Sequence, residues 1–579
     1  MPYFPTRKLT ILGLDPGVRR NGQILTTQIE IPNEFLQNGP RGYRVHVIDF
    51  DASHKVLYES TVIPKTANRD DAPPDDPFAG KPTDELIADP AFHSFMVYGI
   101  VMKTLARFEY ALGRRVGWSF DGPQIQVAPH AFADANAFYT DDAKGLLFGY
   151  FPDSKTREMV YACLSHEVVA HETTHALLDG LRERYTAPSS PQQAGFHEGF
   201  ADIVALLSIL SAPEVAEKAL DLGLPGNKSN MIDKSAVTLK ALKSSALLGL
   251  AAQMGEALSG MHGQALRRSV ELPPGDYLNS PDYQEPHQCG EVLVAAVMNA
   301  YLQTWVRRLD KMSDSPRLDR ERVVEEGAEL ADRLLTMCIR AIDYCPPTDL
   351  QFCDFASAVL TADWELNPRD NKYQIRATLL ESFKAYGIEP RSKRTDGQEG
   401  AWDAPPEELK FFYDRTHFEA MKSDPEELFR FLWENQDAFK LNQQAFTHVL
   451  SVRPCVRIGR DGFVLRETVV EYHQRLELAA RELGAIGVKK PEEMPDGTPV
   501  VLFGGNAVVF DEYGHLKYNI GNSIINNAQP ELQSNRLDYL WRHGYFRKGA
   551  SKLQAFSRMH RIRGSQWFSD VRRPQGEEV

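Results

Sequence analysis

The sequence predicts an α+β protein built from several domains. Strand-like segments characterise residues 1–155, apolar residues at helical spacing characterise residues 156–388, and residues 405–579 mix the two patterns. With 579 residues, 42% of them hydrophobic, the chain is long enough for about three or four domains that each bury a core. We therefore expect a β-rich N-terminal lobe, a helical lobe, a linker at 389–404 and a C-terminal α/β accessory region.

The N-terminal lobe, residues 1–155, is expected to hold hairpins and one long helix. Residues 43–51 and 55–58 predict a hairpin, and residues 124–128 predict a strand. Residues 91–112 carry apolar side chains at helical spacing and predict a helix.

The helical lobe begins with the most informative segment of the chain. Residues 156–180 start with a threonine, continue with apolar residues at helical spacing and end at a glycine, which predicts a helix. This helix contains the sequence HExxH, in which His171 and His175 lie about 40° apart on one face and Glu172 is offset from both. Two imidazoles one turn apart with a carboxylate beside them are typical of a zinc site.

A third protein ligand is needed, because catalytic zinc sites usually have three. Position 181 is leucine, which excludes the HExxHxxGxxH arrangement. Glu198 and Asp202 open the next helical segment and share one face, so one can bind the metal while the other accepts the free N–H of a liganding imidazole. His197 is a competing ligand, whereas His166 points in another direction and is interpreted as structural.

Together these residues resemble the thermolysin-like zinc metallopeptidases, the gluzincins. The resemblance implies a two-lobed fold with a β-rich N-terminal lobe and a helical C-terminal lobe. It also implies that His171, His175 and Glu198 bind zinc, that Glu172 is the catalytic base and that Asp202 orients the first histidine.

Two further segments extend the resemblance. Asn136, Ala137 and the two aromatic residues after them are similar to the family's Asn-Ala-Phe-Trp edge strand, which implies that Asn136 and Ala137 hold the substrate backbone by strand addition. His287 opens a helical segment much as the family's His-Ile-Asn-Ser-Gly motif does. The resemblance therefore implies that His287 stabilises the oxyanion.

Three assignments rest on looser matches. Tyr185, ten residues after His175, lies one residue out of register with the family's second oxyanion donor. Arg267 matches the arginine that grips a substrate carbonyl, with a surface salt bridge as the alternative. Val168 and Leu266 fall where the family has the walls of an apolar substrate pocket.

Metal content follows from the same resemblance, which implies one zinc ion per chain. Calcium stays open, because Glu167 is a possible ligand but Ile209 stands where the family's double calcium site needs a carboxylate. Neither Cys345 nor Cys353 has a CxxC partner, so a second metal site is not expected.

The function implied is that of an intracellular zinc-dependent endopeptidase, a hydrolase that cleaves peptide bonds through a zinc-activated water with Glu172 as general base. Its partner is a protein or peptide substrate. Two alternatives remain. In the first, residues 1–388 form a catalytically weak peptide-binding or interaction module. In the second, the chain is a latent protease, a toxin or defence effector, that its C-terminal region regulates.

Composition and the N-terminal sequence bear on the protein's partners and on its cellular compartment. The net charge of -14 gives no general reason to expect nucleic-acid binding, and no stretch reaches the roughly 18 apolar residues of a membrane span. The first ten residues lack the pattern of a signal peptide, and six irregularly spaced cysteines do not form a disulfide framework. These features predict a cytoplasmic protein.

The accessory region, residues 405–579, resembles no family that we identify. Residues 405–450 predict helices, and residues 463–472, 499–503 and 507–510 predict strands, with a hairpin turn at 511–514. The polar linker is expected to be flexible. Residues 541–564 contain seven Lys and Arg without any Asp or Glu. A solvated helix face is the first interpretation of this basic tail, docking on acidic surface of this chain or on a regulatory protein partner is the second, and nucleic acid is the less favoured partner.

Overall fold

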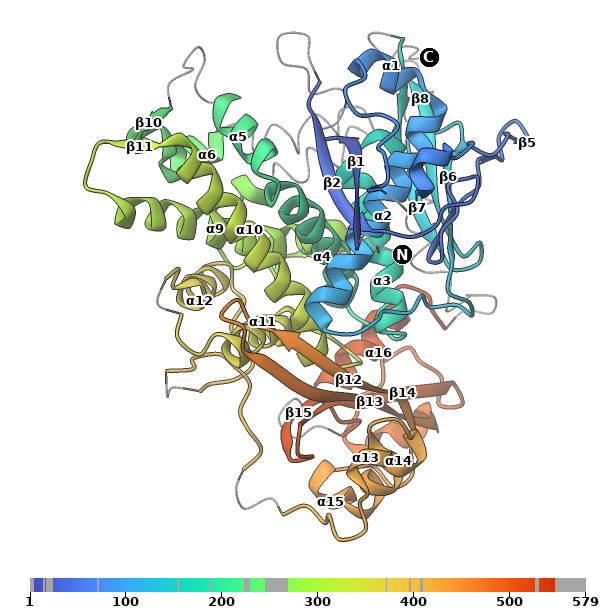
Figure 1. Ribbon diagram of the computed structural model, residues 1–579. Coiled ribbons are helices and arrows are strands. Elements are labelled where there is room, and N and C mark those ends of the chain that lie inside the picture. The colour runs from blue at the N-terminus through green and yellow to red at the C-terminus, as the bar shows by residue number, and fades with distance from the viewer. Residues whose placement is uncertain are drawn as a thin grey trace, which may run out of the picture.

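The computed structural model combines helices and strands throughout the chain, which confirms the α+β class (Figure 1). It describes residues 5–13, 16, 24–69, 72–153, 157–187, 189–222, 230–244, 269–370, 372–394, 397–406, 410–525 and 531–546. Within these residues, no helix combines the length and the apolar character needed to cross a membrane.

A mixed five-stranded sheet forms the N-terminal lobe. Strands β3, β6 and β8 run parallel, while β7 and β9 pair antiparallel with β8. β7 stands at one edge of the sheet, where the sequence predicts an edge strand. The strands are β3 (Val45–Val47), β6 (Ile125–Phe132), β7 (Ala137–Thr140), β8 (Gly145–Pro152) and β9 (Met159–Tyr161).

The expected helix at 91–112 is confirmed as α2 (Pro90–Leu112). It begins where the Asp89 side chain accepts from the Ala91 N–H, and it ends at Gly113, whose φ of 69° lies in the left-handed region that favours glycine. The expected hairpin at 43–58 is confirmed only as a short pairing. The other elements of this lobe are β1 (Thr6–Leu12), β2 (Thr26–Pro32), β4 (Phe50–Asp51), β5 (Val56–Leu57) and α1 (Thr83–Ala88).

Helices make up most of the second lobe (Figure 1). The helix expected from residue 156 begins only at His166, because residues 159–161 pair with β8 and Ser165 caps the helix. The elements are α3 (His166–Leu181), α4 (Pro191–Leu210), α5 (Pro213–Leu222), β10 (Met231–Asp233), α6 (Leu239–Ser244), α9 (Pro286–Met312), β11 (Arg317–Asp319), α10 (Arg320–Ala341), α11 (Phe352–Leu366) and α12 (Ile375–Ala385).

The C-terminal region is a four-stranded antiparallel meander flanked by short helices. Two expectations are corrected here. Helical structure does not continue to residue 450, because β12 begins at Phe446, and the two strands expected at 499–503 and 507–510 are one strand, β14. The hairpin turn at 511–514 is confirmed. The elements are α13 (Phe418–Met421), α14 (Pro425–Glu434), α15 (Gln436–Phe439), β12 (Phe446–Ile458), β13 (Val464–Ala479), β14 (Pro499–Asp511), β15 (Leu516–Asn522) and α16 (Leu532–Arg542).

This meander shares the core of the helical lobe. Cys455, Val469, Val509, Tyr518 and Ile520 are buried in the same apolar cluster as the helices of the first two lobes. The expected flexible linker is also wrong for its described residues. Its backbone is fixed to α11, and the bonds run from Ser392 N to Ser357 Oγ at 3.2 Å and from Trp402 N to Thr361 Oγ1 at 2.8 Å.

Buried ion pairs cross the same boundary. Arg182, the residue after α3, pairs with Glu471 of β13, and both side chains are almost fully buried. Asp343 lies between Arg114 of the N-terminal lobe and Arg457 of β12. Deleting the residues after 400 would leave Arg182 without its carboxylate partner and Asp343 with only one of its two arginines, so we expect truncation to destabilise the protein.

We predict that Glu471→Ala lowers the free energy of unfolding by about 3–5 kcal/mol, because it leaves the buried Arg182 guanidinium uncompensated. Urea unfolding followed by fluorescence measures the change. The control is Lys489→Ala, which breaks an exposed pair with Glu531 and should cost no more than about 1 kcal/mol. Equal effects of the two substitutions would contradict this assignment.

Candidate metal centre

Helix α3 brings the two HExxH histidines together as the spacing predicts. The Nε2 atoms of His171 and His175 are 2.9 Å apart, and both side chains are buried. Each ring holds its other nitrogen against a polar partner from α4. His171 Nδ1 lies 2.8 Å from Asp202 Oδ1, and His175 Nδ1 lies 2.8 Å from His197 Nδ1. These contacts fix the ring orientations, as hydrogen-bond partners behind metal-binding histidines commonly do.

The third ligand position belongs to Glu198. Its Oε2 atom lies 3.6 Å from His171 Nε2 and 3.8 Å from His175 Nε2, on the side where the two nitrogens converge. Asp202, one turn further along α4, reaches the opposite nitrogen of His171. This geometry favours Glu198 over Asp202 as the third member of the group. His197 contacts the outer nitrogen of His175, which places it behind that ligand.

His287 reaches the same oxygen from α9. Its Nε2 atom lies 3.4 Å from Glu198 Oε2, and its Nδ1 atom lies 2.9 Å from Glu285 Oε1. Glu285 also caps α9, accepting from the His287 and Gln288 N–H groups at 3.1 Å each. One carboxylate therefore both starts the helix and orients the imidazole.

Glycines explain why α4 and α9 approach so closely. A Cβ atom at Gly199 would stand 2.7 Å from the Gly290 carbonyl oxygen, and one at Gly195 would stand 2.8 Å from Cys289 Cβ. Larger side chains would force the helices apart. The Gly195 and Gly199 pair lies one turn apart on α4, which is a sequence signal that we did not use.

The donor set fits one zinc ion. Ligand atoms of His171, His175 and Glu198 all lie within 4.8 Å of one another. Zinc holds nitrogen and carboxylate oxygen at about 2.0–2.2 Å in a tetrahedron, which separates neighbouring ligands by about 3.3–3.5 Å. The observed separations of 2.9, 3.6 and 3.8 Å bracket that value.

Burial lowers the pKa of His171, but the Asp202, Glu198 and Glu172 carboxylates together raise it by more.

Glu172 links this group to the edge strand. Its Oε2 atom accepts from the Tyr139 N–H of β7 at 2.9 Å. That N–H points away from β8. Because the backbone groups of alternate residues in an antiparallel strand point to the same side, the N–H and C=O groups of Ala137 also point away from β8. Asn136 precedes the strand and accepts from the Ala137 N–H through its side-chain oxygen at 2.9 Å.

The role expected of Tyr185 is corrected. Its hydroxyl donates to the Pro346 carbonyl at 2.8 Å, and the side chain is 2% exposed against Phe196. A buried hydroxyl with this bond cannot serve an oxyanion without losing its partner. His166 is buried as expected of a structural residue, and burial lowers its pKa to about 3.

The remaining residues that the sequence analysis singled out are either buried or lie outside the described part of the chain. Val168 and Glu167 are buried on the first turn of α3. Arg267 and Leu266 lie outside the described residues, as does the basic tail from residue 547 onward. Arg542 is described, and it pairs with Asp538 on its own helix at 2.8 Å.

A second group of potential metal ligands, which the sequence did not predict, lies close to the start of α3. His93, His130 and Cys163 come together in the N-terminal lobe, and all three are buried. Sequence reasoning considered only cysteine pairs at short spacing and so missed a group whose members come from separate elements. A histidine within the apolar helix α2 was the one available signal.

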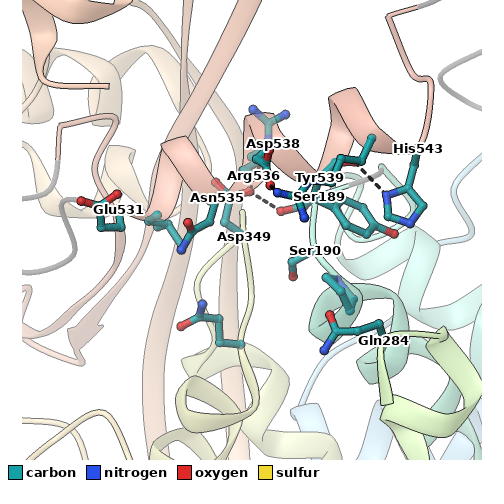
Figure 2. Close-up of a pocket in the computed structure, with 14 residues that line it drawn as sticks. Ser189, Ser190, Gln284, Asp349, Glu531, Asn535, Arg536, Asp538, Tyr539 and His543 are labelled. Carbon is teal, nitrogen blue, oxygen red and sulfur yellow. Dashed lines mark hydrogen bonds and ion pairs between the residues drawn. The ribbon is translucent and has the colours of Figure 1, made fainter. Parts of the chain in front are cut away.

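A cavity of about 550 Å³ lies between the start of α4, Asp349 and helix α16 (Figure 2). Four of its charged side chains pair with one another, and Glu531 pairs with Lys489 outside the cavity. Asp349 Oδ1 lies 3.2 Å from Arg536 Nε, and Asp538 pairs with Arg542. These four groups therefore carry no unbalanced charge, and we assign the cavity no ligand.

Comparison with known proteins adds no assignment, because no protein-family model and no curated protein sequence matches the chain. The coarse conclusion that stands is that buried His and Glu side chains form a group able to hold a metal ion.

We predict that Glu198→Ala lowers the metal content by about one ion per chain, because it removes a ligand from the His171 and His175 group. Elemental analysis of the purified proteins measures the change. The control, His197→Ala, removes a partner behind the ligand and should keep its ion, although with affinity weaker by about tenfold or more. Loss of the ion from the His197 variant alone would reverse the ligand assignment.

Proposed function

We propose that the protein is a zinc-dependent endopeptidase with a thermolysin-like catalytic arrangement in its first two lobes. The observation that carries this proposal is the position of Glu172, whose carboxylate bonds to the edge strand β7 while its helix neighbours His171 and His175 converge on Glu198. A base, a ligand group and a strand with outward-facing backbone therefore meet at one place.

Each part has a chemical task in peptide hydrolysis. When bound, zinc would supply Lewis-acid chemistry by polarising a carbonyl and acidifying a water molecule. Ala137 and Asn136 would align an extended substrate along the outer edge of β7, where the substrate would replace the Asn136 side chain as partner of the Ala137 N–H. Glu172 would take a proton from the attacking water and deliver it to the nitrogen of the leaving amine as the C–N bond breaks.

His287 would serve the tetrahedral stage. Glu285 accepts from its Nδ1–H, which leaves Nε2 directed at the ligand group. In the protonated state this nitrogen donates to the oxyanion that forms when water adds to the carbonyl. Because Tyr185 is committed to Pro346, His287 is the side chain that we assign to this task.

In the competing proposal, the same edge strand binds a peptide but the peptide bond is not hydrolysed. It does not account for the pairing of Glu172 with the strand or for the orientation of His287 by Glu285. The contacts of the C-terminal sheet with the shared core also argue against a releasable inhibitory domain. We therefore retain the endopeptidase as the proposed function.

We predict that Glu172→Gln and His287→Gln each lower cleavage of an unfolded protein at least about a hundredfold, because both groups act mainly in the transition state. Mass spectrometry of the cleavage products measures turnover. Metal content and melting temperature should stay close to those of the unsubstituted chain.

The matched control is Glu183→Gln, which alters an exposed glutamate just after α3 and should leave turnover unchanged. Undetectable cleavage by the unsubstituted, metal-replete chain across varied unfolded substrates would instead favour the binding module.

A further inference from the structure

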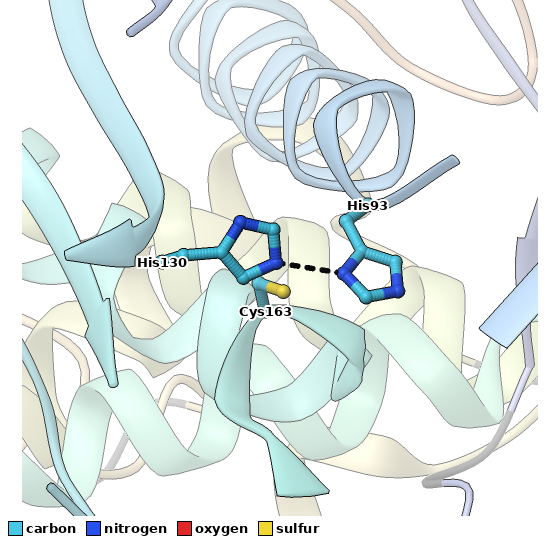
Figure 3. Close-up of side chains that lie close together, drawn as sticks. All are labelled: His93, His130 and Cys163. Carbon is cyan, nitrogen blue, oxygen red and sulfur yellow. Dashed lines mark hydrogen bonds between the residues drawn. The ribbon is translucent and has the colours of Figure 1, made fainter. Parts of the chain in front are cut away.

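The second ligand group lies where α2 and β6 meet the segment before α3, and it shares no residue with the group around His171 and Glu198. His93 comes from α2, His130 from β6 and Cys163 from the short turn Ala162–Leu164, and their side chains point toward one another (Figure 3). Ligand atoms of the three lie within 4.8 Å of one another. Their exposed fractions are 2%, 8% and 0%.

The two rings form a chain of contacts between two fixed acceptors. His130 Nδ1 lies 2.9 Å from Asp49 Oδ2, and His93 Nε2 lies 2.8 Å from the Ile87 carbonyl oxygen. Between them, His93 Nδ1 faces His130 Nε2 at 2.8 Å. A carboxylate and a carbonyl behind two imidazoles is the pattern commonly found around metal-binding histidines.

Counting hydrogens shows that this chain is incomplete as two neutral imidazoles. The contact with the Ile87 carbonyl needs a hydrogen on His93 Nε2, and the contact with the Asp49 carboxylate needs one on His130 Nδ1. Each neutral ring then has its single hydrogen in use. The two facing nitrogens, His93 Nδ1 and His130 Nε2, are left as two lone pairs directed at each other.

We propose that His93 Nδ1, His130 Nε2 and Cys163 Sγ hold a second transition-metal ion. A cation between the facing nitrogens satisfies both lone pairs and leaves both outer contacts intact. Binding releases the Cys163 proton to solvent, so that the thiolate becomes the third ligand. The Asp49 carboxylate then stabilises His130 as a ligand from behind.

The ligand chemistry selects the class of ion. Two imidazoles with one thiolate suit zinc or copper, whereas calcium and magnesium prefer oxygen ligands. The group also occupies a structural junction, because Cys163 stands two residues before Ser165, which caps α3. An ion here would tie the start of the HExxH helix to α2 and β6. This proposal does not depend on the proposed peptidase activity.

Cobalt substitution tests the proposal with a signal specific to sulfur. Full-length protein produced with Co²⁺ should show a thiolate-to-cobalt charge-transfer band, which a site of two histidines and a glutamate cannot give. The band should disappear in Cys163→Ala and persist in Glu198→Ala. Cys338→Ala is the matched control, because Cys338 is equally buried on α10, and it should keep the band.

Elemental analysis of protein purified without added metal identifies the ion. We expect about two transition-metal ions per chain, with zinc and copper counted separately, and about one in His130→Gln. A folded, unsubstituted protein that lacks the charge-transfer band after cobalt loading would overturn the proposal. The same conclusion follows if Cys163→Ala retains the band. In the first case an additional proton shared between the two rings would account for their contact, and in the second the band would come from another cysteine.

Discussion

The burial of polar side chains along helix α3 is the constraint on which the site and the assembly of the lobes both depend. His166, Glu167, His171, Glu172 and His175 are all less than 9% exposed on this one helix. A buried polar or ionised group costs several kcal/mol unless a partner compensates it. For the HExxH residues the partners come from elsewhere in the chain, from α4 and from the edge strand β7.

The same constraint extends beyond the HExxH residues to the end of the helix. Arg182 follows α3 directly, and its buried guanidinium is compensated by Glu471 of the C-terminal meander. The meander also buries Val469 and Ile520 in the core shared with the helical lobe. The C-terminal region therefore belongs to the same packed unit as the metal centre, and we expect the two to unfold together.

Local spacing predicted the parts of the site that one helix or one strand determines. His171 and His175 share a face because they are four residues apart, and Glu198 and Asp202 do so for the same reason. What spacing could not supply is contact between distant segments. The bond from Tyr185 to Pro346 and the group around His93 and His130, which are 37 residues apart, depend on tertiary packing. Likewise, the first five residues of β12, 446–450, fell within the segment expected to be helical, because pairing with β13 decides their conformation.

The two metal sites that we propose would also stabilise a helix of this composition. One group holds the middle of α3 through His171 and His175, while the other would hold its start through Cys163, eight residues earlier in the chain. Each group brings ligand nitrogens of two imidazoles within 2.9 Å of each other in the protein interior. Metal binding would cross-link α3 to α4 in the first group, and α2 and β6 to the start of α3 in the second, so the free energy of binding would become free energy of folding. On this view the buried polar helix is stable because the metal-loaded chain folds as one unit.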